Sequence, residues 1–187
     1  MTENARQQIV ISGVGGQGVL FVTRLLAEAA IARRLPVLTS ETHGMAQRGG
    51  TVISHLKIGE FASPLIRPGN ADGMLVLKEE NVEAHGGFVR AGGWMVVNTA
   101  GDLPVSGVDV HCIDADAEAR RIGLPKAVNL VLLGYGLSRL DRSGAGLCCT
   151  LDDMARIVGA GAEKDPRRAE NSAAALSAGF SAGRSKT

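Results

Sequence analysis

Two glycine-flanked segments near the beginning of the chain carry residue types and spacings that could bind a ligand or a partner. In the first, residues 13–18, glycines at the first, third and sixth positions match the G-x-G-x-x-G turn that lies against a dinucleotide pyrophosphate. In the second, residues 43–50, Arg48 stands between Gln47 and two glycines. A guanidinium on a backbone freed by glycine suits a carboxylate, a phosphate or a partner carbonyl. These two segments are therefore the candidates for a functional site.

The surrounding residues predict the elements that position both segments. The consecutive apolar residues 9–12 are typical of a central parallel strand that is covered on both faces. Residues 19–33 have apolar side chains at helical spacing, and residues 35–39 are a second short strand candidate. Strand, glycine turn and helix together indicate a Rossmann-like opening unit. We expect residues 40–50 to form a loop at the carboxyl edge of the sheet, where α/β folds bind ligands.

The rest of the chain continues the alternation of strands and helices. Further strands are predicted at 51–58, 72–77, 94–98 and 108–113, and helices at 81–90, 115–122, 126–140, 151–158 and 165–180. The strand at 51–58 alternates in hydropathy, which predicts one wetter face. Asp114, Thr150 and Asp165 are expected N-caps, and Asp153 is expected to complete a capping box as a surface charge. We predict a single α/β domain over residues 1–187, with a mostly parallel sheet flanked by helices.

Composition argues against several classes of function. Lys and Arg total 20, Asp and Glu total 19, and aromatic residues make up 3% of the chain, so no basic surface or stacking platform for nucleic acid is expected. The three cysteines include no C-x-x-C pair that could begin a zinc or iron–sulfur site. The first residues lack the apolar core of a signal peptide, and the longest apolar run, 127–137, is shorter than the about 20 residues that span a bilayer. We expect a cytoplasmic protein that binds neither nucleic acid nor membrane.

A dinucleotide site needs more than the glycine turn. It also needs an acidic residue about 20 positions further on, at the end of the second strand, to bind the ribose. The first carboxylate after the predicted strand 35–39 is Glu41, which falls inside the predicted loop, and the bulky Gln17 stands where the backbone would lie against pyrophosphate. Glycines in this turn also allow strand and helix to pack closely without any ligand. A stand-alone Rossmann-type NAD(P)-binding oxidoreductase therefore remains as the alternative function.

The two segments taken together resemble a known family. Gly13-Val-Gly-Gly-Gln-Gly-Val19 followed by His43-Gly-Met-Ala-Gln-Arg-Gly-Gly50 is similar to the gamma-type subunit of 2-oxoacid:acceptor oxidoreductases, which include the pyruvate and indolepyruvate ferredoxin enzymes. The resemblance continues through Ser63-Pro64, Ala71-Asp72, residues 127–134 and Glu170-Asn171, and so covers most of the chain. It implies the small subunit of a heteromeric enzyme that oxidatively decarboxylates a 2-oxo acid to an acyl-CoA.

The resemblance also implies a division of labour among subunits. In this family thiamine diphosphate with magnesium performs the decarboxylation, and iron–sulfur clusters carry the electrons away. Both are expected in partner chains, namely alpha- and beta-type catalytic subunits and an iron–sulfur subunit, with CoA as co-substrate and ferredoxin or an NAD-reducing subunit as acceptor. This chain lacks the Gly-Asp-Gly and downstream Asn of a magnesium-diphosphate site. It is expected to hold no cofactor, to contribute to assembly, to border the CoA channel and to be inactive alone.

The resemblance further marks residues for a subunit interface or for the border of the CoA channel. They are Gly15, Gly16, Gln17, Gly18, His43, Gln47, Arg48, Gly49 and Gly50. Each of three side chains also has another interpretation. Gln17 is interpreted equally well as a brace of its own turn, and His43 as an anchor of its loop or a proton shuttle. Arg48 could instead form half of an internal ion pair. A regulatory module that binds an anionic metabolite through Arg48 is a third class of function. No catalytic residue or metal ligand is expected, and residues 42–48 look more like the indolepyruvate-type subunit, which favours an aryl or branched 2-oxo acid.

Overall fold

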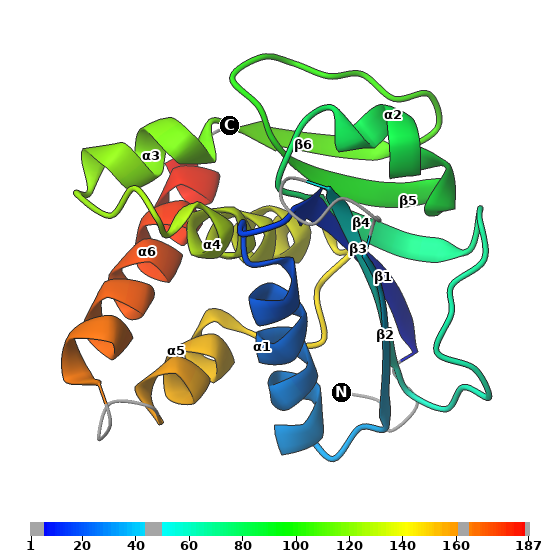
Figure 1. Ribbon diagram of the computed structural model, residues 1–187, viewed down its shortest axis with the longest axis horizontal. Coiled ribbons are helices and arrows are strands. Elements are labelled where there is room, and N and C mark those ends of the chain that lie inside the picture. Colours follow the sequence, from blue (N-terminus) through cyan, green and yellow to red (C-terminus); the bar gives the residue numbers. More distant parts are fainter. Residues whose placement is uncertain (1–5, 44–49, 161–164, 186–187) are drawn as a thin grey trace.

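The computed structural model describes residues 6–43, 50–160 and 165–185, and each predicted strand and helix has a counterpart in it (Figure 1). The strands are β1 (Gln7–Val14), β2 (Val37–His43), β3 (Thr51–Ile58), β4 (Ala71–Val76), β5 (Val89–Asn98) and β6 (Asp109–Ile113). The helices are α1 (Val19–Ala32), α2 (Asn81–His85), α3 (Ala115–Arg121), α4 (Val128–Ser143), α5 (Leu151–Gly159) and α6 (Pro166–Ser185), with a 3₁₀ turn at Gly86–Phe88.

The six strands form one sheet in the order β2-β3-β1-β4-β5-β6. β1, β4, β5 and β6 are parallel neighbours, whereas β3 pairs antiparallel with both β1 and β2. The predicted α/β fold, with a mostly parallel sheet and flanking helices, is confirmed. The opening strand, turn and helix form as in a Rossmann unit. However, β3 lies between β1 and β2, so the second strand of the chain is an edge strand.

The end of β2 differs from the prediction. The strand begins at Val37 and continues to His43 instead of ending at Thr39, so residues 40–42 lie in the ladder with β3 and not in a loop. An edge strand tolerates polar side chains because one of its sides meets solvent, and Glu41 and Thr42 are indeed exposed. Glu41 is therefore a strand residue, and β3 separates it from β1.

The chain between β4 and β5 also differs from the prediction. The helix predicted over 81–90 is limited to α2 and the 3₁₀ turn, and β5 begins at Val89 instead of Trp94. The adjacent glycines at 86 and 87 end the helix because their backbone is less restricted than that of other residues.

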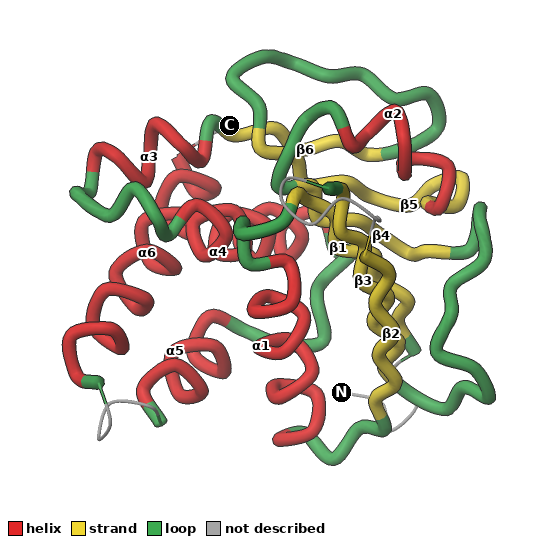
Figure 2. The backbone as a smooth tube through the Cα atoms, in the orientation of Figure 1, coloured by secondary structure: helices red, strands yellow, loops and turns green. Residues whose placement is uncertain are grey.

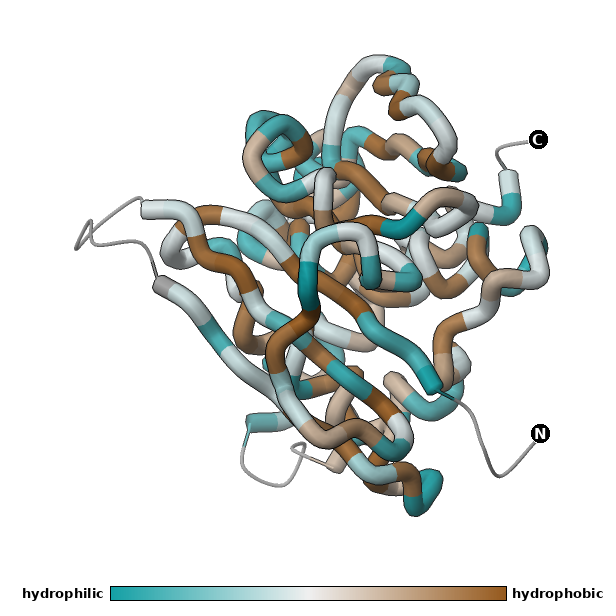
Figure 3. The backbone as a smooth tube through the Cα atoms, turned by 90° about the vertical axis from the view of Figure 1, so that its right-hand side faces the viewer, coloured by the Kyte–Doolittle hydropathy of each residue, from teal (hydrophilic) through white to brown (hydrophobic). Residues whose placement is uncertain are grey.

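The larger helices cover one face of the sheet. Figure 2 shows α1, α3, α4, α5 and α6 on one side of the strands and α2 on the other. The core on the side of the larger helices includes the fully buried Leu26, Leu56 and Leu133. The core on the opposite face includes Val10 and Met74, and the segments 59–70 and 99–108 help to cover it. Figure 3 views this second face and shows hydrophobic and hydrophilic residues alternating along the strands.

The face of β3 that was predicted to be wetter is buried. His55 and Lys57 are 4% and 8% exposed because the segment 59–70 crosses this face. The backbone N–H of Ile66 lies 3.4 Å from His55 Nδ1, and the ring of Phe61 lies 5.0 Å from Lys57 Nζ. Burial lowers the pKa of both side chains. The alternation of residues along β3 therefore predicted correctly which side chains share a face of the sheet. It did not predict that the segment 59–70 covers one of these faces.

The predicted helix caps are present. The side chains of Asp114, Thr150 and Asp165 each accept the backbone N–H three residues further on. Asp153 completes the capping box at Thr150, but it is not a surface charge: it is 6% exposed and pairs with Arg33 and Arg156. Burial opposes the ionisation of Asp153, but hydrogen bonds from Thr150 and Arg33 outweigh it, and its pKa is lowered.

α4 and α6 cross closely at glycine residues. A Cβ atom on Gly134 would lie 2.1 Å from the carbonyl oxygen of Leu176, and one on Gly179 would lie 2.0 Å from the carbonyl oxygen of Val131. Both separations are far below van der Waals contact, so only glycine allows these two backbones to approach so closely. This contact holds the last helix of the domain against the helix layer.

Gly134→Ala and Gly179→Ala should each lower the free energy of unfolding by about 1–3 kcal/mol, because the added methyl group overpacks a helix contact that cannot open locally. Denaturant titration followed by circular dichroism measures the effect. Gly159→Ala is the matched control, since Gly159 is also helical but has no atom within 4 Å of its Cβ position. That variant should be as stable as the parent or more stable by up to ~1 kcal/mol. Equal destabilisation in all three variants would contradict the close crossing.

Candidate functional site

The glycine turn joins β1 to α1 at the carboxyl edge of the sheet. Gly16 and Gly18 have φ angles of +93° and +83°, a conformation that other residues rarely adopt. A Cβ atom on Gly13 would lie 2.8 Å from Val19 Cγ2 and 3.1 Å from Leu77 Cβ. Backbone conformation and the close packing of β1, β4 and α1 thus account for glycine at these positions without a ligand.

Gln17 braces the turn from inside. Its Oε1 accepts the backbone N–H of Val14 at 2.8 Å, and its Nε2 donates to the carbonyl oxygen of Leu77 at 3.2 Å. The side chain therefore ties the end of β1 to the residue that follows β4. Of the two interpretations of Gln17, this geometry matches the local brace.

The second segment begins and ends beside the turn. His43 is the last residue of β2 and pairs with Val52, while Gly50 precedes β3. The carbonyl oxygen of Gly50 accepts the N–H of Gly15 at 3.0 Å, which links the two glycine motifs directly. Of the other predicted site residues, Gln47, Arg48 and Gly49 lie outside the described residues. The fold nevertheless brings both ends of their segment to the predicted edge of the sheet.

A buried polar cluster behind the turn was missed by the sequence analysis. Asn81 Nδ2 donates to Ser12 Oγ at 3.0 Å and to the carbonyl oxygen of Gly13 at 2.9 Å. Ser12 Oγ lies 2.7 Å from His85 Nδ1. With Asn81 donating to its oxygen, the Ser12 hydroxyl can donate to a neutral imidazole, and burial lowers the pKa of His85 in agreement with that state. Ser12 has no exposed surface, so this hydroxyl supports the turn and is not placed to attack a substrate.

A second polar cluster fixes the ends of β4 and β5. Asn98 Nδ2 donates to the Leu77 carbonyl oxygen at 3.2 Å and to Asp116 Oδ2 at 2.7 Å, and Asn98 Oδ1 accepts the N–H of Ala115 at 2.9 Å. Nearby, Thr99 Oγ1 donates to Glu79 Oε2 at 2.6 Å. In the sequence, this cluster could have been recognised from the polar residues Asn98 and Thr99 at the end of an apolar strand. These bonds make the carboxyl edge a braced surface from β1 to β6.

The described part of the chain contains neither a candidate metal site nor a candidate membrane-spanning helix. No group of three or more His, Cys, Asp and Glu side chains is arranged to hold a metal ion among these residues. Within the same ranges no helix is both long enough and apolar enough to cross a bilayer. The described part of this edge offers hydrogen bonding by backbone, amide, hydroxyl, imidazole and carboxylate groups.

The sequence is similar to a known protein family and to several of its members. Residues 8–182 match the family described as pyruvate ferredoxin/flavodoxin oxidoreductase. An indolepyruvate oxidoreductase subunit of Archaeoglobus fulgidus is 43% identical over 101 residues, which are 54% of this chain and 50% of that protein. A pyruvate synthase subunit of Methanothermobacter thermautotrophicus is 33% identical over 133 residues, which are 68% of this chain and 72% of that protein. The chain spans about half the length of several curated indolepyruvate oxidoreductase subunits that it matches.

Solved structures share the fold. The gamma subunit of a keto/oxoacid ferredoxin oxidoreductase from Geobacter sulfurreducens superposes with a TM-score of 0.75 at 22% identity, over 96% of this chain and 99% of that one. A 2-oxoglutarate:ferredoxin oxidoreductase from Magnetococcus marinus, solved with 2-oxoglutarate, coenzyme A and succinyl-CoA bound, gives a TM-score of 0.79 at 19% identity. It covers 99% of this chain, which corresponds to 32% of the larger one.

The neutral state of His85 predicts a loss of stability in acid. Because burial in the folded protein lowers the pKa of His85 below its ordinary value, the unfolded chain binds a proton in this pH range that the folded chain does not. The free energy of unfolding should therefore fall as the pH drops from about 7 toward about 5. His85→Asn removes this titration and should reduce the slope of that part of the pH profile, as measured by urea titration at several pH values. His55 and His111, whose pKa values are also lowered by burial, account for the slope that remains. Glu83→Gln, an exposed change in the same helix, is the control, and an unchanged slope in His85→Asn would contradict the assignment.

Proposed function

The chain belongs to the pyruvate ferredoxin/flavodoxin oxidoreductase family, and on that premise we propose that it is the small, gamma-type subunit of a 2-oxoacid:acceptor oxidoreductase. The complete enzyme would be thiamine-diphosphate-dependent and would oxidatively decarboxylate a 2-oxo acid to an acyl-CoA. The observation that carries the proposal is the direct bond between the two glycine motifs, Gly15 to Gly50, in a chain that matches this family almost from end to end.

The proposal assigns the redox chemistry to partner chains. Thiamine diphosphate, magnesium and iron–sulfur clusters would be held by alpha- and beta-type catalytic subunits and an iron–sulfur subunit, and ferredoxin or an NAD-reducing subunit would accept the electrons. The isolated chain would be inactive. We also place the complex in the cytoplasm.

The contribution of this chain would be structural and would be made at the carboxyl edge of its sheet. The braces from Gln17 and Asn98 converge on the carbonyl oxygen of Leu77, and the bond from Gly15 to Gly50 attaches the end of the second segment to this braced edge. A segment supported in this way can offer Arg48 to a carboxylate, a phosphate or a partner carbonyl at the border of the CoA approach. The same surface would hold the thiamine-bearing chains in register.

The proposed substrate is an aryl or branched-chain 2-oxo acid. Four curated relatives at 38–46% identity are named as indolepyruvate oxidoreductase subunits. A ketoisovalerate oxidoreductase subunit of Methanothermobacter thermautotrophicus is 30% identical over 175 residues. The names agree with the resemblance of residues 42–48 to the indolepyruvate-type subunit.

The alternative, a stand-alone NAD(P)-binding oxidoreductase, is opposed by the sheet order. In a dinucleotide unit the acidic residue that binds the ribose lies at the end of the strand next to β1. Here Glu41 lies on β2, and β3 occupies the position next to β1. With adjacent strands about 4.8 Å apart, Glu41 is displaced by about 10 Å from the line of β1.

Affinity purification of the tagged full-length chain from its own cells, at native expression, tests the proposal. We expect larger chains to co-purify, with bound thiamine diphosphate and iron–sulfur absorbance. With CoA and an acceptor dye, the eluate should oxidise aryl or branched 2-oxo acids in preference to pyruvate. A chain that elutes alone and holds a nicotinamide nucleotide would replace the proposal with the alternative, and Gly15→Val should then abolish nucleotide binding.

Arg48→Gln tests the role of the second segment in that complex. If Arg48 borders the CoA approach, the variant should raise the KM for CoA by about tenfold, the effect of losing one charge-assisted hydrogen bond, with little change in kcat. If it locks a neighbouring subunit, the variant should instead release partner chains during purification. Arg167→Gln, at an exposed position on α6, is the matched control and should change neither. Parent-like kinetics and assembly in Arg48→Gln would remove Arg48 from the site.

A further inference from the structure

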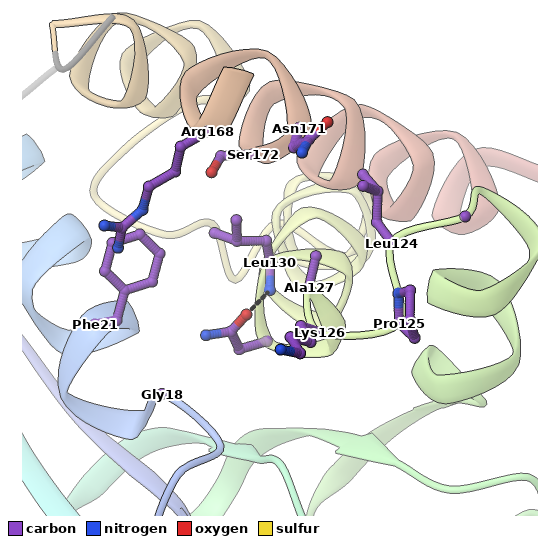
Figure 4. A pocket seen from close by; sticks show the side chains of 12 residues that line it. Gly18, Phe21, Leu124, Pro125, Lys126, Ala127, Leu130, Arg168, Asn171 and Ser172 are labelled. Atoms are coloured by element: carbon purple, nitrogen blue, oxygen red, sulfur yellow. Dashed lines mark hydrogen bonds between the residues drawn. The ribbon is translucent and has the colours of Figure 1, made fainter. Parts of the chain in front are cut away.

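A cavity of about 720 Å³ opens among α1, α4 and α6, on the side of the sheet that carries the larger helices. Its walls are built from Gly18 and Phe21 at the start of α1, residues 123–127 before α4, Asn129 and Leu130 within α4, and three residues of α6. Figure 4 shows the labelled side chains of these elements around one space. The proposed function does not use this cavity, and the inference drawn from it does not rest on that function.

The charged residues that line the cavity are both cations. Lys126 and Arg168 belong to its wall, and none of the twelve lining residues is Asp or Glu. Neither cation forms an ion pair within the described part of the chain; the Arg168 guanidinium lies 5.8 Å from the centre of the Phe21 ring. Three carboxylates share neighbouring hollows with Arg168 outside this wall, Glu28 and Asp165 in one and Glu41 in another. The cavity therefore favours a negatively charged occupant.

Two helix N-termini add to this positive potential. α1 starts after Gly18 and α4 starts after Ala127, both at the cavity wall. Neither N-cap residue accepts a hydrogen bond with its side chain, and neither helix has an acidic residue in its first turn. The positive ends of two helix dipoles thus lack a neutralising side chain at the same place, which is the arrangement that binds phosphate and other oxyanions.

Two buried polar side chains at the cavity have unused hydrogen-bonding atoms. Ser172 is 8% exposed, its hydroxyl points toward the cavity in Figure 4, and it has no hydrogen-bond partner among the described residues. Asn129 is also 8% exposed; its Oδ1 accepts the N–H of Leu130 at 2.9 Å, the dashed line in Figure 4, but its Nδ2 finds no acceptor in the same ranges. Both atoms are therefore available to a bound acceptor.

We propose that this cavity binds a small organic phosphate. The phosphate group would lie between the N-termini of α1 and α4, in reach of Lys126, Arg168 and the Asn129 amide. A phosphate fits better than a carboxylate because its three terminal oxygens can use this many donors at once. The apolar body of the ligand would pack against Phe21, Leu124 and Leu130, which supply the hydrophobic part of the wall.

Titration of the purified full-length chain tests the proposal, with isothermal calorimetry and ¹⁵N NMR as readouts. The probes are inorganic phosphate, phenyl phosphate and uncharged phenol. We expect saturable one-site binding of both phosphates, tighter for phenyl phosphate, and no saturable binding of phenol. The amide signals of Asn129 and Ser172 should shift on binding. Arg168→Gln and Lys126→Gln should each weaken phenyl phosphate binding by about tenfold, and Ser172→Ala by less.

Arg167→Gln is the matched control, because Arg167 is exposed on the same helix but does not line the cavity. It should bind phenyl phosphate as the parent does, and thermal unfolding establishes that each variant is folded. Absence of saturable phosphate binding, or equal affinity of Arg168→Gln and Arg167→Gln, would overturn the proposal. A third outcome would also overturn the proposal: neither the parent nor the variants bind small anions, but the variants capture partner subunits less well. The cavity would then receive a carboxylate of a partner subunit.

Discussion

The antiparallel ladder between β1 and β3 is the constraint on which the carboxyl edge of this protein depends. It pairs Val14 with Thr51, so the chain that leaves β2 must return beside the glycine turn before it enters β3. Backbone hydrogen bonds, and not side-chain chemistry, thereby bring together two motifs that are separated by a whole helix and strand. The bond from Gly15 to Gly50 continues the ladder by one step beyond the strands. Because β3 lies between β1 and β2, β2 is not the neighbour of β1. A single ladder thus joins the two glycine motifs and also separates the turn from Glu41, the nearest carboxylate along the chain that could have bound a ribose.

Neutral amide side chains hold that edge in place. Gln17 and Asn98 both donate to the carbonyl oxygen of Leu77, at 3.2 Å each, and so tie the turn after β1 to the ends of β4 and β5. Asn81 does the same for the end of β1 from the other face of the sheet. An amide offers a donor and an acceptor without a charge, so it can satisfy buried backbone groups at a lower desolvation cost than an ion would incur. The charge of these three amide braces therefore does not change with pH, in contrast to that of His85 next to Ser12.

The sequence predicted what local interactions determine. Strand and helix periodicity located the six strands and six helices of the described ranges. The caps at Asp114, Thr150 and Asp165 were predictable because each uses an N–H only three residues away. What it missed depends on residues distant in the chain. Asp153 is buried because Arg33, 120 positions earlier, pairs with it, and the wetter face of β3 is dry because a later crossover covers it. In the candidate site, the meeting of the two motifs was predictable from the rule that loops gather at the carboxyl edge. The partners of Gln17 and the cluster around Ser12 were not, since periodicity carries no information about which distant backbone groups need a partner.

The atoms around the Cβ position of each glycine show whether glycine is needed there for packing or leaves room for a ligand. A Cβ on Gly13 would meet Val19 and Leu77, and one on Gly18 would lie 2.2 Å from Asn129 Nδ2, so both positions are closed by the protein itself. Packing thus accounts for two of the three glycines of the dinucleotide spacing, Gly13 and Gly18, which is why the motif alone is weak support for a nucleotide. Gly18 nevertheless has a consequence for binding: because it lacks a side chain, the Asn129 amide can approach the N-terminus of α1. Its unpaired donor then lies beside the N-termini of α1 and α4, whose first turns hold no acidic side chain. The turn that resembles a phosphate loop would thus contribute to an anion site on its inner side, through a residue more than a hundred positions away, instead of over the glycines themselves.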